Sequence, residues 1–286
     1  MWPRCKGRVM TPAAGPVTGA SKAHKVPRPA ATVTLVRDTP QGVEVLMVQR
    51  NFQSVFVPGA YVFPGGAVDR ADSSSDIAAL CTGLDDAEAS RKLGIASGGL
   101  AYWVAAIRES FEEVGMLLAC DDQGEIVTLD DSVRAARFHA YRSRVEHGEH
   151  PLSDMLKDEG LRLPLQQMTY FSHWITPPNA PRRYDTRFFV AVAPPSQQPL
   201  HDNRETINHL WVRPAQALDQ HQQNQFEMRT PTVHTLKLFA EHDKVSSLIN
   251  SLQALGDIPV VAPRISADGR RVLPGDPAYD AADTLV

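Results

Sequence analysis

The sequence predicts an α/β (α+β) fold, in which helices cover a mixed β-sheet. Segments rich in β-branched and aromatic residues are typical of strands, and they lie at 31–37, 43–50, 61–63, 168–175, 186–192 and 207–212. Segments with apolar residues three or four positions apart are typical of helices, and they lie at 101–119, 130–147, 151–159 and 232–255. Because strands and helices are interleaved along the chain, we expect both to contribute to one sheet-centred architecture.

The first half of the chain predicts a hairpin, a short strand and a helix. Residues 38–42, which include Pro and Gly, form the turn between the first two strands, and residues 61–63 enter a Pro-Gly-Gly turn. In the helix at 101–119, Ile107, Phe111, Val114 and Leu118 form one apolar stripe. Gly115 costs roughly 1 kcal/mol relative to Ala inside a helix, so we expect a close backbone approach there.

The second half predicts a helical insertion and a final helix. The helices at 130–147 and 151–159 make up an insertion at about 130–163. After the remaining strands, we expect a long amphipathic C-terminal helix at 232–255, with Val233, Leu236, Phe239 and Ala240 on one face.

Composition limits the class of protein. A chain of 286 residues with 43% apolar and 22% charged residues is ordinary for a globular protein, and the net charge of −4 does not favour nucleic-acid binding. No run approaches the roughly 18 apolar residues of a membrane span. Three widely spaced cysteines predict a reducing compartment, so we expect a cytoplasmic location. Nothing in the sequence indicates an oligomeric state.

Residues 1–29 differ from the rest and predict a flexible, basic, proline-rich arm ahead of a single domain at 30–286. Residues 1–29 contain six Lys or Arg and no acidic residue, the first being Asp38, and their five prolines disfavour a helix. The arm lacks the apolar core of a secretory signal. Residues 284–286, Thr-Leu-Val, do not resemble the Ser-Lys-Leu peroxisomal address.

The acidic residues of the central helix point to a metal. Glu109, Glu112 and Glu113 stand at i, i+3 and i+4, so they share one helical face. Three carboxylates in one patch repel each other unless a cation neutralises them, and hard cations such as Mg²⁺ or Mn²⁺ prefer oxygen ligands. Metal-assisted chemistry on phosphates is the commonest use of such a site. The alternative is a solvated acidic face.

Two segments together resemble the Nudix box of the Nudix hydrolases. The run 108–115, Arg-Glu-Ser-Phe-Glu-Glu-Val-Gly, matches the second half of the box, and Gly66 in the Pro-Gly-Gly turn matches its first glycine. Asp72 stands where the family has Glu, and 35 residues instead of seven separate it from Arg108. The inserted residues, at about 73–100, are rich in Ser, Ala, Gly and Asp and predict a surface excursion.

An insert at this point resembles the Nudix branch that includes the peroxisomal coenzyme A diphosphatases, as do the stretches 174–177, 181–189 and 273–277. The resemblance covers about 30–277. It implies a Nudix α/β/α sandwich and a metal-dependent hydrolase that cleaves the diphosphate of coenzyme A or acyl-CoA, giving 3′,5′-ADP and phosphopantetheine. Two alternatives stay open, an ADP-ribose or NADH diphosphatase and a non-catalytic Nudix-fold nucleotide sensor.

The resemblance also implies roles for the box residues. Glu112 and Glu113 are the first candidates for metal ligands, followed by Glu109, and the backbone carbonyl of Gly65 completes the metal shell. Gly66 allows the tight loop. Arg108 is expected to orient a box glutamate rather than to contact the substrate.

Basic residues outside the helix are candidates for binding a small-molecule diphosphate. Arg182 and Arg183 are the first choice, because a guanidinium matches a phosphate, although a solvated loop is the alternative. Arg50 ends the second strand beside the box turn and is a third candidate. A metal-activated water would be the attacking group, and its base is unassigned. For Glu205 a surface charge is favoured over that role, and Tyr184, Phe188 and Phe189 are expected in the core rather than in an adenine pocket.

Overall fold

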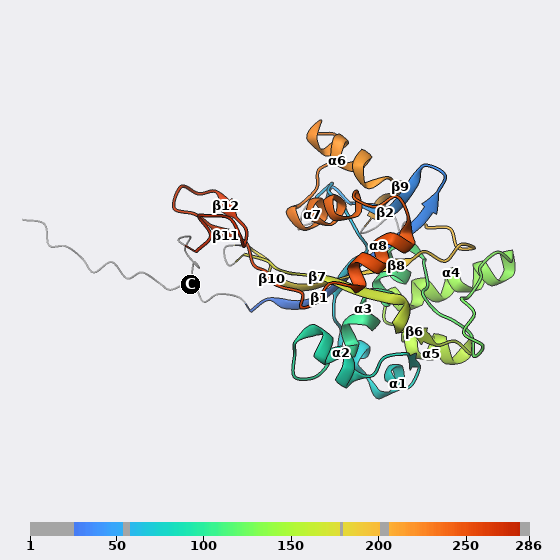
Figure 1. Cartoon of the computed structure of the whole chain (residues 1–286). Helices are drawn as coiled ribbons and strands as arrows, with labels where there is room; N and C mark the ends of the chain where they lie inside the picture. The colour runs from blue at the N-terminus through green and yellow to red at the C-terminus, as the bar shows by residue number, and fades with distance from the viewer. Residues whose placement is uncertain (1–25, 54–57, 178–179, 201–205, 281–286) are drawn as a thin grey trace, which may run out of the picture.

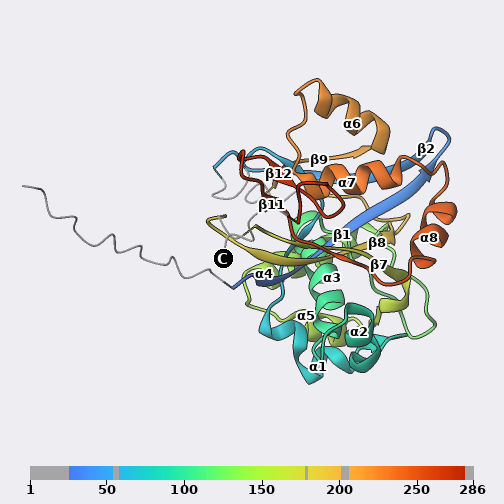
Figure 2. The same ribbon diagram turned by 60° about the vertical axis from the view of Figure 1, so that its left-hand side comes forward.

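The computed structural model describes residues 26–53, 58–177, 180–200 and 206–280. A mixed sheet lies between two helical layers, with α1–α5 on one face and α6–α8 on the other (Figure 1, Figure 2). Each layer buries its own apolar cluster against the sheet. This arrangement confirms the predicted α/β class.

The strands of the described residues form one eight-stranded mixed sheet and two small two-stranded sheets. The order in the large sheet is β10 (Val260–Val261), β7 (Met168–Ile175), β8 (Tyr184–Val192), β1 (Arg28–Thr39), β2 (Gly42–Arg50) and β3 (Tyr61–Val62). Two more strands lie off this path, β4 (Gly65–Ala67) beside β1 and β9 (Thr206–Val212) beside β2. Parallel pairing of β1 with β8 beside antiparallel pairing with β2 makes the sheet mixed.

Strand β1 is the centre of this sheet. Ala31, Val33 and Leu35 face one apolar cluster and Val36 faces the other, so both faces of the strand are covered. The strand begins at Arg28, inside the range 1–29 expected for the arm. Residues 1–25 of that arm lie outside the described residues.

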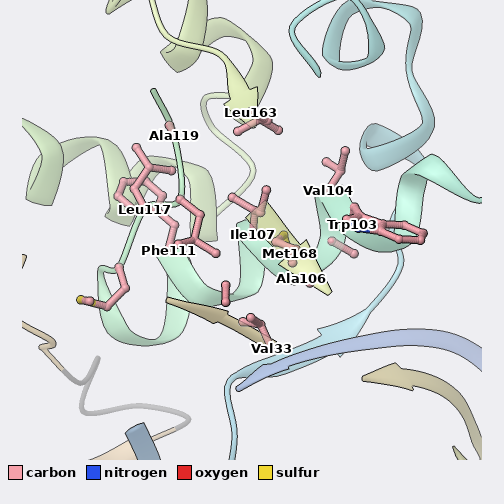
Figure 3. Close-up of a cluster of buried hydrophobic side chains, with 14 of the residues drawn as sticks. Val33, Trp103, Val104, Ala106, Ile107, Phe111, Leu117, Ala119, Leu163 and Met168 are labelled. Atoms are coloured by element: carbon pink, nitrogen blue, oxygen red, sulfur yellow. The ribbon is translucent and has the colours of Figure 1, made fainter. Parts of the chain in front are cut away.

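Helix α3 (Leu100–Val114) is the predicted box helix, and it is buried on almost every side. Figure 3 shows Ile107 and Phe111 of the apolar stripe within its cluster. The prediction that the helix continues to residue 119 is wrong. Gly115 adopts φ +68°, and its N–H donates to the Phe111 carbonyl at 3.0 Å. Gly115 therefore ends the helix as a left-handed cap.

The insert at 73–100 is more ordered than the predicted surface excursion, although most of its residues are exposed or half-buried. It folds as α1 (Ser75–Ala78), β5 (Cys81–Thr82) and α2 (Asp86–Leu93), after a 3-10 turn, η1 (Arg70–Ser73). Ile77, Ala89 and Leu93 are buried in the same cluster as α3. The reason is that α3 is apolar beyond its sheet-facing stripe, so its outer side also needs a cover.

The helical insertion contains α4 (Ser132–Glu146) and α5 (Leu152–Asp158), which confirms the helices predicted at 130–147 and 151–159. Asp131 caps α4 by accepting hydrogen bonds from the N–H groups of Val133 and Arg134. The insertion ends at β6 (Leu163–Pro164), which pairs with β5, and the 3-10 turn η2 (Leu165–Gln167) leads into β7. The two insertions therefore contact each other on the outer side of α3.

The C-terminal region departs from the predicted single helix at 232–255. It contains α7 (Thr230–Phe239) and α8 (Val245–Gln253), and Asp38, near the end of β1, accepts a hydrogen bond from the Val245 N–H at the start of α8. Helix α6 (Pro214–Gln222) was not predicted, although Pro at its first position is a known start signal. A small hairpin of β11 (Arg264–Ile265) and β12 (Arg271–Val272) follows. None of the described helices is long and apolar enough to cross a membrane.

Candidate active site

The Pro-Gly-Gly turn brings the backbone of β4 against helix α3. A Cβ atom on Gly65 would lie 2.5 Å from the Ala31 carbonyl oxygen, and a Cβ atom on Gly66 would overlap the carboxylate of Glu109. Neither position accepts a side chain without displacing backbone or the box carboxylate. Glycine is therefore required here because of close approach.

The three box glutamates extend from the last two turns of α3 toward this turn. Glu113 is 5% exposed, and its Oε2 atom accepts a hydrogen bond from the Gly65 N–H at 3.1 Å. Glu109 and Glu112 are less deeply buried, and both accept from Nη1 of Arg108, at 2.8 and 3.1 Å. Helix α3 thus gathers the three side chains on one side, as the i, i+3 and i+4 spacing predicts.

Burial and crowding make this cluster electrostatically unfavourable. Burial raises the pKa of Glu112 to about 7, the charge of Arg108 opposes this rise, and the charge of Glu109 adds to it. One guanidinium therefore does not neutralise the carboxylates around it. A bound cation would relieve the excess negative charge.

Arg108 lies at the centre of a buried ion-pair network. Asp72 is 2% exposed and accepts hydrogen bonds from Nε and Nη2 of Arg108, at 2.8 and 2.9 Å. Nη2 also donates to the Ala67 carbonyl, next to the Gly-Gly turn. Burial alone would lower the pKa of Arg108, but the hydrogen bonds with Asp72 and the charge of Glu109 raise it, so the guanidinium stays charged. Asp72 precedes the insert in sequence and Arg108 follows it, so this ion pair holds the two ends of the insert together.

Arg50 lies near the C-terminal end of α3. It pairs with Thr206 across an irregularity between β2 and β9, and the Thr206 hydroxyl donates to the Glu113 carbonyl at 3.5 Å. Thr206 therefore lies between Arg50 and the box helix. Nothing in the sequence around Thr206 indicates this contact.

Arg182 and Arg183 lie at the start of β8, at the end of the sheet where β1 begins. Nε of Arg183 donates to the Thr176 carbonyl, and the Arg28 N–H donates to the Arg183 carbonyl. Since Gly66 pairs with Ala31, three residues beyond Arg28, the box turn is roughly 10 Å along β1 from this point. Arg182 is exposed, and Arg183 is half-buried.

The remaining candidates divide between core and undescribed positions. Phe189 packs on Trp103 of α3 with ring centroids 4.6 Å apart, and Phe188 lies in the opposite apolar cluster. Both are therefore core residues, as expected. Tyr184 is half-buried. Glu205 lies outside the described residues.

The donor set fits a hard divalent cation. Glu109, Glu112 and Glu113 offer carboxylate oxygens, and Gly66 leaves room for a carboxylate against the backbone. Within the described part of the chain, no three His, Cys, Asp or Glu side chains are placed so that they could hold a metal ion together. Glu109 and Glu112 face Arg108, whereas Glu113 faces Gly65. Metal binding here is chemically suited to the residues.

Comparison with known proteins agrees with this geometry. The family model for the NUDT19 Nudix domain matches residues 85–238, which include the box helix. The chain belongs to this family. The resemblance to Nudix hydrolases in the sequence is thereby confirmed, and the chain is a Nudix hydrolase.

Individual relatives extend the match to most of the chain. The acyl-coenzyme A diphosphatase NUDT19 of Xenopus laevis is 27% identical over 273 residues, covering 82% of this chain and 71% of that protein. The protein of the same name from Gallus gallus is 28% identical, covering 84% and 74%. A crystal structure of a NUDIX hydrolase from Alicyclobacillus acidocaldarius superposes with a TM-score of 0.67 at 27% identity, covering 83% of this chain and all of that one.

Proposed function

We propose that this Nudix hydrolase cleaves the diphosphate linkage of coenzyme A or an acyl-CoA, and that it requires Mg²⁺ or Mn²⁺. The products would be 3′,5′-ADP and phosphopantetheine or its acylated form. The observation that carries the hydrolytic role is the placement of the box carboxylates: Glu113 and Glu109 lie against Gly65 and Gly66, and Glu112 shares Nη1 of Arg108 with Glu109. The substrate class is supported by the acyl-coenzyme A diphosphatases to which most of the chain is similar.

The proposed chemistry assigns each box residue a task. Glu112 and Glu113, then Glu109, would hold the cation, together with the Gly65 carbonyl. When bound, a divalent cation polarises phosphoryl oxygens and lowers the pKa of a water. Arg108 keeps Glu109 and Glu112 in place through its Nη1 atom. In the reaction, the water oxygen forms a new bond to phosphorus while the bridging P–O bond of the diphosphate breaks.

The substrate side of the site needs positive charge, because carboxylates alone repel a diphosphate. Arg50 is the first candidate, because its strand partner Thr206 contacts the Glu113 carbonyl at the end of the box helix. Arg182 and Arg183 lie farther along β1 and would contact the distal parts of a long substrate. A small diphosphate compound is thus the proposed partner, and a cytoplasmic location stays a prediction.

A substrate panel tests this proposal. The full chain is incubated with Mg²⁺ or Mn²⁺ and with coenzyme A, acetyl-CoA, ADP-ribose, NADH, diadenosine polyphosphates or a nucleoside triphosphate, and the products are identified by mass. We expect 3′,5′-ADP from coenzyme A, and no product once a chelator is added. Cleavage of ADP-ribose or NADH instead would keep the metal site and overturn the substrate. Tight binding without turnover would identify a nucleotide sensor.

A glutamate substitution supplies the control for the panel. Glu112→Gln should abolish turnover in an enzyme and should leave ligand binding largely intact in a sensor. Glu88→Gln is the matched variant, because Glu88 lies on α2 in an exposed ion pair with Lys92. Glu88→Gln should keep wild-type turnover.

A further inference from the structure

The C-terminal end of α3 is bound by three separate segments of the chain. The last carbonyls of a helix have no partner within it. In α3 the Glu112 carbonyl accepts from Nε of Arg142 at 2.8 Å, and the Val114 carbonyl accepts from the Leu200 N–H at 2.9 Å. The Glu113 carbonyl accepts from the Thr206 hydroxyl at 3.5 Å. The turn that carries Glu112 and Glu113 is therefore fixed from outside the helix.

Arg142 makes the strongest of these contacts. It lies on α4 in the helical insertion, it is 4% exposed, and its Nη1 atom donates to the Leu200 carbonyl at 2.7 Å. One guanidinium thus bridges the last turn of α3 and the segment that precedes β9. A positive charge at a helix C-terminus is also favoured by the helix dipole.

The cap residue Gly115 contributes to the same contact. A Cβ atom on Gly115 would lie 3.4 Å from Nη1 of Arg142, so the guanidinium packs closely over the end of the helix. Arg137, on the same helix α4, pairs instead with Glu159 at the surface. The two arginines lie on the same helix and carry the same charge, but Arg142 binds the end of α3 whereas Arg137 forms a surface ion pair.

We infer that Arg142 is a positioning residue for the metal-binding end of α3. By holding the Glu112 carbonyl, it sets the backbone from which the Glu112 and Glu113 side chains extend. The helical insertion is then part of the active site, although it supplies none of the box residues. This inference rests on the proposed function, because it takes the two glutamates as metal ligands.

The form of the side chain matters for this role. A guanidinium presents donors in a rigid fork and reaches the Glu112 and Leu200 carbonyls together. A lysine keeps the charge but has one compact ammonium group, and a glutamine keeps neither the charge nor the reach. Loss of the fork leaves a buried carbonyl of the last turn without its partner. Misplacement of a catalytic group by about 1 Å can cost on the order of 10²-fold in rate.

The test compares Arg142→Gln, Arg142→Lys and the control Arg137→Gln in the full chain. The dissociation constant for Mn²⁺ is measured by calorimetry, kcat and KM are measured on the substrate that the panel identifies, and Tm reports folding. We expect Arg142→Gln to weaken Mn²⁺ binding about tenfold and to lower kcat about tenfold, with KM within about twofold. Arg142→Lys should show about a third of the loss, and Arg137→Gln should match the wild type.

The outcomes separate this inference from the proposed function. Wild-type protein that neither binds Mn²⁺ nor cleaves any diphosphate overturns both. Active wild-type protein, with a folded Arg142→Gln variant that binds Mn²⁺ normally, overturns the role of Arg142 alone. If Arg142→Gln does not fold, Arg142→Lys decides, because normal Mn²⁺ affinity and kcat in that variant would also overturn the role.

Discussion

Two buried ionic clusters lie on the α3 side of the sheet, and they differ in how their charges are balanced. Around Arg108, one guanidinium faces four carboxylates, those of Asp69, Asp72, Glu109 and Glu112. Around Arg187, one guanidinium and one imidazole, that of His173, face a single carboxylate, that of Asp185.

The pKa values follow this difference. In the Arg108 cluster, burial and neighbouring charge raise the pKa of Glu112 to about 7. In the Arg187 cluster, burial alone would raise the pKa of Asp185, but the hydrogen bond with His173 and the charge of Arg187 hold it below its ordinary value. The comparison teaches that buried charge by itself does not mark a functional site. In the Arg108 cluster the carboxylates outnumber the guanidinium, and the proposed cation would supply the missing positive charge.

The largest expected effect comes from Glu112→Gln in the unbalanced cluster. Hydrolysis should fall on the order of 10³-fold, because a metal ligand is lost. The free energy of unfolding should stay within about 1 kcal/mol of the wild type, since Gln still accepts from Arg108 and one repelling charge is gone. Turnover and urea unfolding are measured on the same preparation. A large loss of stability would show that the cluster is structural, like the one around Arg187.

The second effect tests the ion pair of Arg108 with Asp72 separately from the contacts of Arg108 with Glu109 and Glu112. Asp72→Asn weakens the bidentate pair and should cost about 3 kcal/mol in the free energy of unfolding, because Asp72 and Arg108 are both buried. It should also lower kcat, since Arg108 no longer holds Glu109 and Glu112 in one place. Asp72→Glu, which restores the usual box residue, is the companion variant. Unchanged kcat in folded Asp72→Asn would contradict the positioning role of this pair.

The contacts of Asp72 show where sequence prediction stops. The glutamate spacing within one helix predicts that the carboxylates share a face, because helical geometry is local. The pairing of Asp72 with Arg108 spans 36 positions and depends on how the insert folds back. Likewise, Thr206 and Arg142 reach α3 from distant segments, and their neighbours in sequence carry no pattern that indicates it.

The same limit explains the errors in the fold. The sequence predicts β1, β2, β3, β7, β8, β9 and the helices α4 and α5, because they follow local periodicity, but it does not predict the short strands β4, β5, β6, β10, β11 and β12. At the start of α8, the Val245 N–H donates to Asp38, which is 207 positions away. The cover that α1 and α2 give to α3 could not be predicted, since it depends on tertiary contacts of Ile77, Ala89 and Leu93 with the cluster around α3.

The third effect tests the balanced cluster. Asp185→Asn should cost about 2 kcal/mol in the free energy of unfolding at neutral pH, because Arg187 is buried and loses its negative partner. A depressed folded-state pKa stabilises fully above the unfolded value of about 3.9 and is lost as pH falls through the folded value. The difference between wild type and variant should therefore be constant above about pH 5 and should shrink below about pH 4. Urea unfolding across this range measures it, and kcat of the folded variant should stay normal. A pH-independent difference would contradict the balance of charge described for this cluster.

The smallest effect concerns Arg50, the candidate that would bind the diphosphate next to the negatively charged Arg108 cluster. Arg50→Gln should raise KM for the diphosphate substrate about tenfold, with kcat within about threefold, because a charged hydrogen bond to phosphate contributes about 1.4 kcal/mol or more. Arg182→Gln is the matched comparison, since Arg182 is exposed and lies on the far side of the box turn along β1. Its effect should be about threefold or less. If Arg182→Gln raises KM more than Arg50→Gln does, the diphosphate lies toward the β7–β8 turn rather than beside Thr206. Arg182, rather than Arg50, would then contact the diphosphate, and Arg50 would face a more distant part of the substrate.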